Sequence, residues 1–193
     1  MRAMLRILVV ALAPFWAAGP AGAATVDGLS LPDTYPVAGQ TLKLNGMGVR
    51  TLTIFNVRIY VAGLYLAQPS RDARQILAST TPKVILLQFL RHGSKADVEK
   101  QYRAGESVNC GNGGCEPADE PDFEALVKAS PGVEAGDTTT FIIDSHGVRV
   151  LSNNRTIGDF ANKDLAFHLL AGFIGDHPPS ISLRQHLLGI ERD

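Results

Sequence analysis

The chain has 193 residues, 45% of them hydrophobic, and its 18 Lys and Arg nearly balance its 19 Asp and Glu, giving a net charge of −1. This balance, without any run of basic residues, argues against a nucleic-acid partner and against a polybasic surface for membranes. The length suits one domain with a proper hydrophobic core.

The first 23 residues have the features of a signal peptide. Arg2 and Arg6 lie beside an apolar run at residues 5–13, and residues 21–23 (AGA) form a small-x-small cleavage site. The alternative, an uncleaved anchor, needs about 20 apolar residues, and prolines interrupt this run sooner. We therefore expect removal of residues 1–23, which changes the net charge from −1 to about −3. A single domain at residues 24–193, a periplasmic or secreted location and no stable membrane insertion follow from this reading.

Residues 44–66 (LNGMGVRTLTIFNVRIYVAGLYL) predict a β-hairpin. Two runs rich in Val, Ile, Thr, Tyr and Phe flank a turn near Phe55 and Asn56. Gly46 and Gly48 precede the first run, where glycine lets the backbone turn sharply or lets another segment approach closely.

Helices and one central strand are predicted after the hairpin. Ser70 is expected to cap a short helix, and residues 83–90 (KVILLQFL) predict a strand that is buried on both faces. Ser94 begins a polar surface helix, with Asp97 placed to meet the free amides of its first turn. Asp122 is expected to cap the helix that follows.

Cys110 and Cys115 are the only cysteines, in the segment VNCGNGGCEP. Its glycines allow the two sulfurs to meet, and export exposes them to an oxidising compartment, so we expect a local disulfide. A redox pair is the alternative, but the C-x-x-C spacing at a helix start is absent. No histidine lies nearby, and no histidine pair has metal-ligand spacing, so we expect no metal and no cofactor.

The last part of the chain predicts a meander followed by helices. Residues 165–174 (LAFHLLAGFI) are apolar nearly all round, which indicates a buried helix in which His168 is a core histidine rather than a catalytic one. Ser182 and Gln185 have the spacing of a capping box for a final helix. Strands gathered in a meander with helices to one side predict an α+β fold, a curved antiparallel sheet with a helical layer. The three short strands are expected at residues 138–143, 147–151 and 155–157.

Arg50 is the residue that points most clearly to a site. Alternate residues of a strand share a face, so Arg50 is expected beside Leu52 and Ile54. A guanidinium keeps its proton and, when partly buried, needs an anion or several acceptors. It is either a structural arginine paired to a carboxylate, or an anion receptor at the end of an apolar cavity, with Tyr60 and Tyr65 as further donors. A receptor of this kind selects a ligand with one anionic end and an apolar body, such as a fatty acid or a phenolic acid.

Three segments together resemble the chalcone isomerase superfamily, in particular bacterial chalcone-isomerase-like proteins with a signal peptide. They are GMGVRTLTIFNVRIYVAGLYL at residues 46–66, KVILLQFLR at residues 83–91 and FIGDHPPSISLRQHLLG at residues 173–189. The similarity extends over residues 39–189. It implies an open-faced β-sandwich, a large antiparallel sheet with a helical layer and a cleft between them.

The resemblance also implies roles for particular residues. In plant chalcone isomerases an arginine at the position of Arg50 stabilises an enolate, and in fatty-acid-binding members an arginine and a tyrosine hold a carboxylate. Arg50 matches directly, Tyr60 stands where the isomerases have a threonine, and Thr156 falls near their late Ser/Thr position. An ungapped comparison puts Ala96 and Arg103 where the isomerases have a tyrosine and an asparagine, with Tyr102 one residue away.

The sequence thus favours an exported, non-enzymatic binding protein that holds a fatty acid or another small apolar carboxylate, or a phenolic ligand. Arg50, Tyr60, Tyr65 and Thr156 are the expected ligand-binding residues. The alternative is an isomerase, an intramolecular lyase for a chalcone-like enone, in which Arg50 is catalytic and stabilises the enolate. A third reading is a structural partner in an envelope complex, with a vestigial cleft filled by its own side chains.

Overall fold

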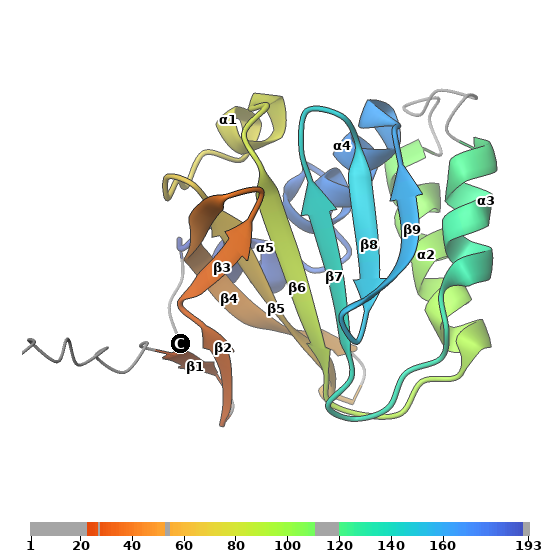
Figure 1. The fold of residues 1–193 in the computed structure, drawn as a ribbon. Coiled ribbons are helices and arrows are strands. Elements are labelled where there is room, and N and C mark those ends of the chain that lie inside the picture. Colours follow the sequence, from red (N-terminus) through yellow and green to blue (C-terminus); the bar gives the residue numbers. More distant parts are fainter. Residues whose placement is uncertain (1–22, 27, 53–54, 111–119, 191–193) are drawn as a thin grey trace, which may run out of the picture.

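Seven strands of the described residues form one antiparallel sheet at the centre of the fold (Figure 1). The computed structural model describes residues 23–190 except 27, 53–54 and 111–119. Each strand pairs with its neighbour in sequence, so the whole sheet is a meander. The strands are β3 (Thr34–Val37), β4 (Gln40–Leu52), β5 (Val57–Leu66), β6 (Lys83–Phe89), β7 (Thr138–Ile143), β8 (Val148–Ser152) and β9 (Arg155–Phe160).

β4 and β5 form the predicted hairpin. Arg50 pairs with Tyr60, and Thr51 pairs with Arg58, so the register shifts by one residue directly after Arg50. A shift of this kind is a bulge, which bends the strand and changes the direction of nearby side chains. In the turn, Asn56 has a φ of 51°, a left-handed conformation that Asn adopts more readily than most residues.

Helices cover one face of the sheet and close the main hydrophobic core. Leu165, Leu170 and Ile174 from one helix pack with Leu64 and Ile85 of the central strands. This arrangement confirms the predicted α+β fold, a curved antiparallel sheet with a helical layer. The helices are α1 (Ala73–Ala78), α2 (Lys95–Cys110), α3 (Glu120–Ala129), α4 (Lys163–Ile174) and α5 (Ile181–Leu187).

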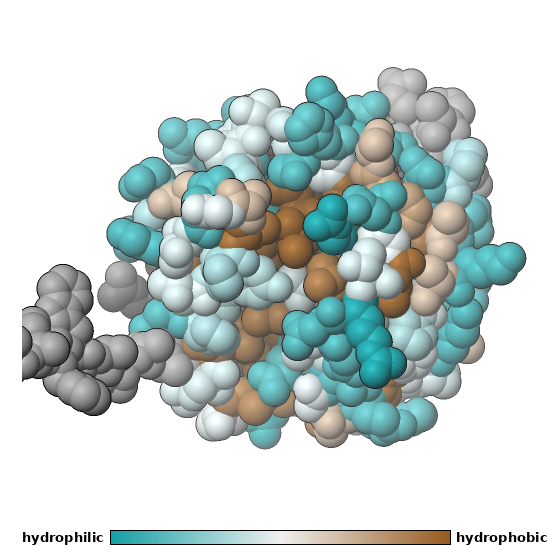
Figure 2. Space-filling model, viewed as in Figure 1, coloured by the Kyte–Doolittle hydropathy of each residue, from teal (hydrophilic) through white to brown (hydrophobic). Residues whose placement is uncertain are grey.

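A small ribbon packs against the other face of the sheet. It consists of β1 (Ala23–Val26) and β2 (Leu29–Pro32), which pair only with each other. Leu31 of this ribbon is buried with Leu42 and Tyr65 in a second, smaller core. Seen from this side, apolar side chains show between polar ones over the middle of the molecule (Figure 2). The sheet is therefore covered by helices on one face and only in part on the other.

The helix starts are partly as predicted. Ser94 and Asp97 form the expected reciprocal cap, because the Asp97 amide donates to Ser94 Oγ at 3.2 Å and the Ser94 amide donates to Asp97 Oδ2 at 2.9 Å. The prediction that Ser70 caps α1 was wrong. Asp72 is the cap, and its side chain accepts hydrogen bonds from the first amides of the helix. α3 starts at Glu120, so Asp122 lies inside it rather than capping it.

The last helix also begins differently from the prediction. Ser180, not Ser182, caps α5 by accepting a hydrogen bond of 3.2 Å from the Leu183 amide. Ser182 stands in the first turn and is exposed. α4 ends at Ile174 with Gly175 as its C-cap, and the two prolines before Ser180 keep the helix from resuming. Ser180 has the extended conformation that a cap requires.

This assignment predicts different effects for the two serines. Ser180→Ala is expected to lower the free energy of unfolding by about 1 kcal/mol, because an amide of the first turn loses its acceptor. Ser182→Ala should change it by less than about 0.5 kcal/mol, as for most exposed positions. Urea unfolding of both variants measures the difference, and equal losses would contradict the cap.

Some predictions fall outside the described residues. The predicted signal peptide lies at residues 1–23, of which only Ala23 is described, and Cys115, one partner of the predicted disulfide, is not described. None of the described helices is long and apolar enough to span a membrane. Within the described ranges, no group of three or more His, Cys, Asp or Glu side chains could hold a metal ion.

Candidate functional site

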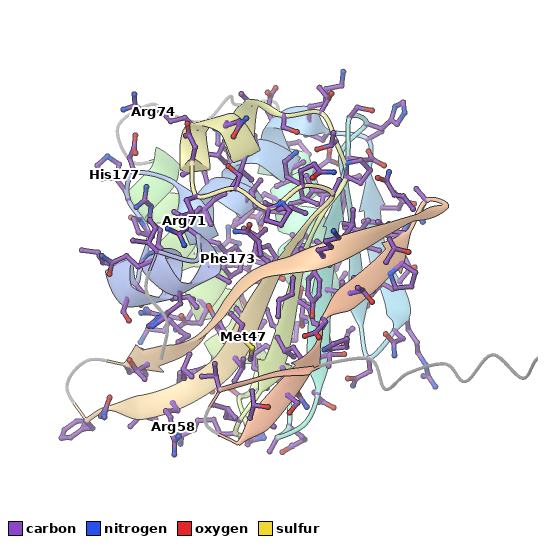
Figure 3. The ribbon with its side chains drawn as sticks, turned by 90° about the vertical axis from the view of Figure 1, so that its left-hand side faces the viewer. Met47, Arg58, Arg71, Arg74, Phe173 and His177 are labelled. Atoms are coloured by element: carbon purple, nitrogen blue, oxygen red, sulfur yellow. The ribbon has the colours of Figure 1, made fainter. Side chains whose placement is uncertain are left out.

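A cavity of about 700 Å³ lies between the sheet and the helices, mainly α2 and α4. Its volume is in the range of ligand-binding pockets. Phe173 reaches from α4 toward the sheet and its ring lies 6.0 Å from that of Phe141 (Figure 3). Most of the wall is hydrocarbon, so the cavity favours an apolar occupant. The apolar lining includes Leu52, Ile59, Leu87, Phe89, Phe123, Phe141, Leu165, Leu169 and Phe173.

Arg50 stands in this wall, partly buried, at the bulge of β4. Its Nη1 donates to the carbonyl oxygen of Pro179 at 2.8 Å and to that of Thr51 at 3.3 Å. Nη1 is thereby engaged by two acceptors. Among the described residues, neither Nε nor Nη2 has a hydrogen-bond partner, and no carboxylate pairs with this guanidinium. The edge of the guanidinium that Nε and Nη2 form therefore remains available. A carboxylate can accept two parallel hydrogen bonds from this edge.

Tyr60 lies directly across from Arg50 on the neighbouring strand. Its ring packs edge-on against Phe89, with 5.8 Å between centroids, and it lines the cavity. Burial raises the pKa of Tyr60 from 10.0 to about 12, although the charge of Arg50 acts in the opposite direction. The phenol is therefore neutral near pH 7 and carries a hydrogen that it can donate. Within the described part of the chain its hydroxyl has no hydrogen-bond partner.

Tyr102 is a cavity residue that the sequence comparison did not assign. It lies on α2, its ring meets that of Phe123 edge-on at 6.4 Å, and its hydroxyl is 3.5 Å from Ser130 Oγ. Burial is the main cause of the raised pKa of Tyr102. Helical spacing in the sequence could have identified Tyr102 as a cavity residue, because the α2 residues that line the cavity repeat at i, i+3, i+4 and i+7. These residues include Val98, Gln101, Tyr102 and Gly105.

The two residues that the ungapped comparison selected on α2 lie elsewhere. Ala96 is exposed, and Arg103 binds Glu124 of α3 with two hydrogen bonds, one of them 2.7 Å long. The guanidinium of Arg103 also sits 5.4 Å from the centre of the Phe123 ring. Arg103 therefore joins α2 to α3 and does not line the cavity.

Tyr65 and Thr156 are not part of the cavity wall, which corrects their predicted role in the site. Tyr65 is fully buried on the opposite face of the sheet, where its hydroxyl donates to the Pro32 carbonyl oxygen at 2.9 Å. Tyr60 and Tyr65 are five residues apart in one strand, and an odd separation places two side chains on opposite faces. Thr156 lies on β9, is exposed and pairs with Leu151.

The position of Arg50 depends on how closely α5 approaches β4. A Cβ on Gly46 would lie 2.0 Å from the backbone oxygen of His186, and one on Gly48 would lie 2.6 Å from the His186 Cβ. Asn45 strengthens this contact, because its Nδ2 donates to the Leu187 carbonyl oxygen at 2.8 Å. Of the two roles expected for these glycines, a sharp turn or a close approach, the structure shows the close approach, and α5 is the segment that approaches.

The segment between α4 and α5 is held in place as well. Arg184 Nε donates to the carbonyl oxygens of Ile174 at 3.0 Å and Gly175 at 2.9 Å, which ties the end of α4 to α5. Pro179 lies in this segment, and its carbonyl oxygen is the one that fixes Arg50. The direction of the guanidinium is thus set by a chain of contacts that begins at the two glycines of β4.

Tyr60→Phe tests the neutral phenol in the wall. For a fatty acid, the ligand class that the sequence predicts, we expect the affinity to fall by about 1 kcal/mol, roughly fivefold in Kd, through loss of one donor. The ratio of the two Kd values should stay constant at pH values well below the Tyr60 pKa of about 12. Fluorescence titration at several pH values measures it, and a ratio near one throughout would show that the hydroxyl does not contact the ligand.

Tyr60→Phe is also expected to change how stability depends on pH. Because the pKa of Tyr60 is higher in the folded than in the unfolded protein, its contribution to the free energy of unfolding is fully present below pH 10. This contribution is lost as the pH rises from 10.0 to about 12, since the unfolded chain then releases the proton that the folded protein keeps. Tyr60→Phe should therefore lose less stability than the parent protein across that window. Urea unfolding on both sides of the window gives the comparison, and identical losses would argue against the buried phenol.

One protein family and one solved structure are similar to this chain. A sequence model of the family described as "Chalcone isomerase-like" matches residues 23–189. Among solved structures, a fatty-acid binding protein of Arabidopsis thaliana superposes with a TM-score of 0.68 and 16% sequence identity, over 86% of this chain and 96% of that chain. No curated protein sequence matches the chain. At this identity the structural match establishes a shared fold.

Proposed function

We propose a function from the premise that this chain belongs to the chalcone isomerase-like family. The protein binds a fatty acid or a similar small apolar carboxylate in its cavity, without converting it. The observation that supports this most is the Arg50 guanidinium, which stands in an apolar wall with Nε and Nη2 free of partners among the described residues.

The chemistry of the wall defines the ligand. The carboxylate accepts two parallel hydrogen bonds from Nε and Nη2 of Arg50 and a third from the Tyr60 hydroxyl. Charge-assisted bonds of this kind are stronger where water is excluded, and the surrounding rings exclude it. The alkyl chain then extends along the hydrocarbon between α2, α4 and the sheet. The name of the Arabidopsis thaliana relative, a fatty-acid binding protein, supports this ligand class.

Extraction of lipids from purified protein, followed by mass spectrometry, tests the proposal directly. We expect fatty acids in a ratio near one per chain. Protein stripped of lipid should then take up a long-chain fatty acid again, as measured by displacement of a fluorescent analogue. Stripped protein that binds no fatty acid at any concentration below the onset of micelles would rule this function out.

Catalysis is the second candidate, because the cavity brings Tyr102 to the same wall as Arg50 and Tyr60. Arg50 would stabilise an enolate formed from a chalcone-like enone, and one of the two phenols would orient the substrate. The measurement is the loss of enone absorbance against the spontaneous rate, with Arg50→Ala as control. No excess over the spontaneous rate would dispose of this candidate.

The two remaining readings of Arg50 and the cleft receive less support. A purely structural arginine would pair with a carboxylate, whereas the hydrogen-bond partners of Arg50 among the described residues are two carbonyl oxygens. A vestigial cleft would be filled by its own side chains, whereas about 700 Å³ is open between the sheet and the helices. Both observations favour a site that takes a ligand.

We also propose that the protein acts after export, with residues 1–23 removed and Cys110 joined to Cys115. The apolar run at residues 5–13 and the AGA site support cleavage, and the glycine-rich spacing of the cysteines supports the bridge. The intact mass of protein recovered from its native compartment tests both points. An uncleaved chain would overturn the first point. A mass that rises by two alkyl groups when the denatured protein is alkylated without a reductant would overturn the second, because only free thiols react under those conditions.

A further inference from the structure

Thr139 brings a hydroxyl group into the apolar wall of the cavity. It lies on β7, is half-buried and lines the cavity on the same face of the sheet as Phe141, two residues further along. Among the described residues the Thr139 hydroxyl has no hydrogen-bond partner, and no fully buried polar side-chain atom there lacks one. The hydroxyl is therefore open to the space on this face of the sheet, which is the cavity.

A plain alkyl chain would leave this hydroxyl unpaired. Across the strands Thr139 lies opposite Leu87, which also lines the cavity, so the wall around the hydroxyl is hydrocarbon. A ligand that covers the hydroxyl takes water away from it, and a polar group that loses water without gaining a partner costs free energy. A ligand with a hydrogen-bonding group at this point avoids that cost.

Tyr102 brings a second hydroxyl to the cavity from α2. Its hydroxyl is 3.5 Å from Ser130 Oγ, which is long for a hydrogen bond between two oxygens. Ser130 has one hydroxyl hydrogen, and the shorter bond of 2.9 Å to the Leu126 carbonyl oxygen takes it. The Tyr102 oxygen therefore keeps its capacity to accept a hydrogen bond from a ligand. In Figure 1, α2 and α3 lie beside β8 and β9, on the other side of the sheet from β4, which carries Arg50.

The Thr139 hydroxyl lies far from the guanidinium of Arg50. Arg50 lies opposite Tyr60 on β5, which in turn lies opposite Phe89 on β6. Thr139 lies opposite Leu87, two residues before Phe89. Three strand spacings and two residues separate the Cα atoms of Arg50 and Thr139 by roughly 16 Å in the sheet, the reach of about a dozen methylene groups. A carboxylate bound at Arg50 thus brings the middle of a long alkyl chain to Thr139.

We propose that the cavity selects fatty acids that carry a hydroxyl group in the middle of the alkyl chain. Thr139 exchanges a hydrogen bond with that hydroxyl, and Tyr102 is a second partner, because a hydroxyl both donates and accepts. Arg50 and Tyr60 hold the carboxylate at the other end. This inference rests on the proposed function, since it needs a carboxylate at Arg50, and it adds the chemical class of the acid.

Competition between acids of equal chain length tests the selection. Octadecanoic acid and 12-hydroxyoctadecanoic acid each displace a fluorescent fatty acid from lipid-stripped protein. We expect the hydroxylated acid to bind more tightly to the parent protein, since a site that bonds a hydroxyl discriminates against the analogue without it. An acid with its hydroxyl beside the carboxylate, 2-hydroxyoctadecanoic acid, should show no such advantage, because its hydroxyl lies far from Thr139.

Thr139→Val removes the hydroxyl and keeps the shape of the side chain. We expect it to reduce the ratio of the two Kd values, octadecanoic over 12-hydroxyoctadecanoic acid, about tenfold. Tyr102→Phe should reduce the same ratio by a smaller factor. Thr156→Val is the matched control, because Thr156 is exposed on β9 and lies outside the cavity wall, and it should leave the ratio unchanged. The unfolding temperature shows that each variant is folded.

Arg50→Ala separates the two ends of the ligand. It should weaken both acids by the same factor and keep their ratio, because contacts this far apart act independently.

The outcomes distinguish this inference from the proposed function. Equal binding of the two acids by the parent protein, or an unchanged ratio in Thr139→Val, would overturn the inference and leave the binding of fatty acids intact. A parent protein that binds neither acid would contradict the proposed function, and this inference with it.

Discussion

Replacement of Arg50 by alanine is expected to weaken the binding of a long-chain fatty acid by about 2 kcal/mol or more, roughly thirtyfold in Kd. The carboxylate then lies in an apolar wall with no charged donor, and it keeps only the bond from Tyr60. Loss of one member of a desolvated charged pair costs more than the pair itself contributes, because the other charge stays buried without a partner. Isothermal titration calorimetry measures the change.

Two further variants make this result specific. Arg50→Lys keeps the charge but loses the planar fork, so its affinity should fall between those of the parent protein and of Arg50→Ala. Arg149→Gln removes an arginine that pairs with Asp159 outside the cavity, and it should leave the affinity unchanged. If Arg50→Ala binds within twofold of the parent protein, the anion does not sit at Arg50.

Gly46→Ala is expected to cause the largest loss of stability, about 3 kcal/mol in the free energy of unfolding. The new Cβ would lie 2.0 Å from the His186 oxygen and 2.7 Å from the Leu187 oxygen. Both are backbone atoms, so no side-chain rotation relieves the clash and α5 must move away from β4. For a domain of this size the loss corresponds to a fall in Tm of about 6–12 °C, measurable by circular dichroism.

The same substitution should also weaken ligand binding, because a displaced α5 takes the Pro179 carbonyl oxygen away from Arg50. Gly105→Ala is the matched control for stability alone, because a Cβ there meets no atom within 4 Å but Gly105 lines the cavity. Alanine is the better helix former, so this control should stabilise the protein by up to about 1 kcal/mol. A Gly46→Ala protein as stable as the parent would mean that α5 does not pack on β4 in this way.

Local pattern was enough to predict most of the fold. The hairpin, the buried strand at residues 83–90 and the three-strand meander all follow from period-two hydrophobicity and turn residues, which act between neighbours in sequence. The candidate ligand-binding arginine was also visible, because Arg50 interrupts an apolar strand. The position of Tyr65 could have been read from the same alternation, since it is an odd number of residues from Tyr60.

Helix caps and the α2 wall were less accessible to sequence reasoning. Several Ser and Asp residues near each boundary have the chemistry of a cap, and only backbone conformation decides between neighbours such as Ser180 and Ser182. An ungapped comparison chose Ala96 and Arg103 on α2, whereas the helix turns Tyr102 toward the cavity. A shift of one residue rotates a side chain by about 100° around the helix, enough to move it out of the wall.

The sequence by itself determined the strands, the helical layer and the presence of an arginine in an apolar strand, because each depends on residues close together in the chain. Only the tertiary structure decided what surrounds that arginine. Its partner at Pro179 is 129 residues away, and the two meet because α5 packs on the bare backbone of Gly46 and Gly48. Contacts between distant segments depend on how whole elements pack, and spacing along the chain carries no record of that packing.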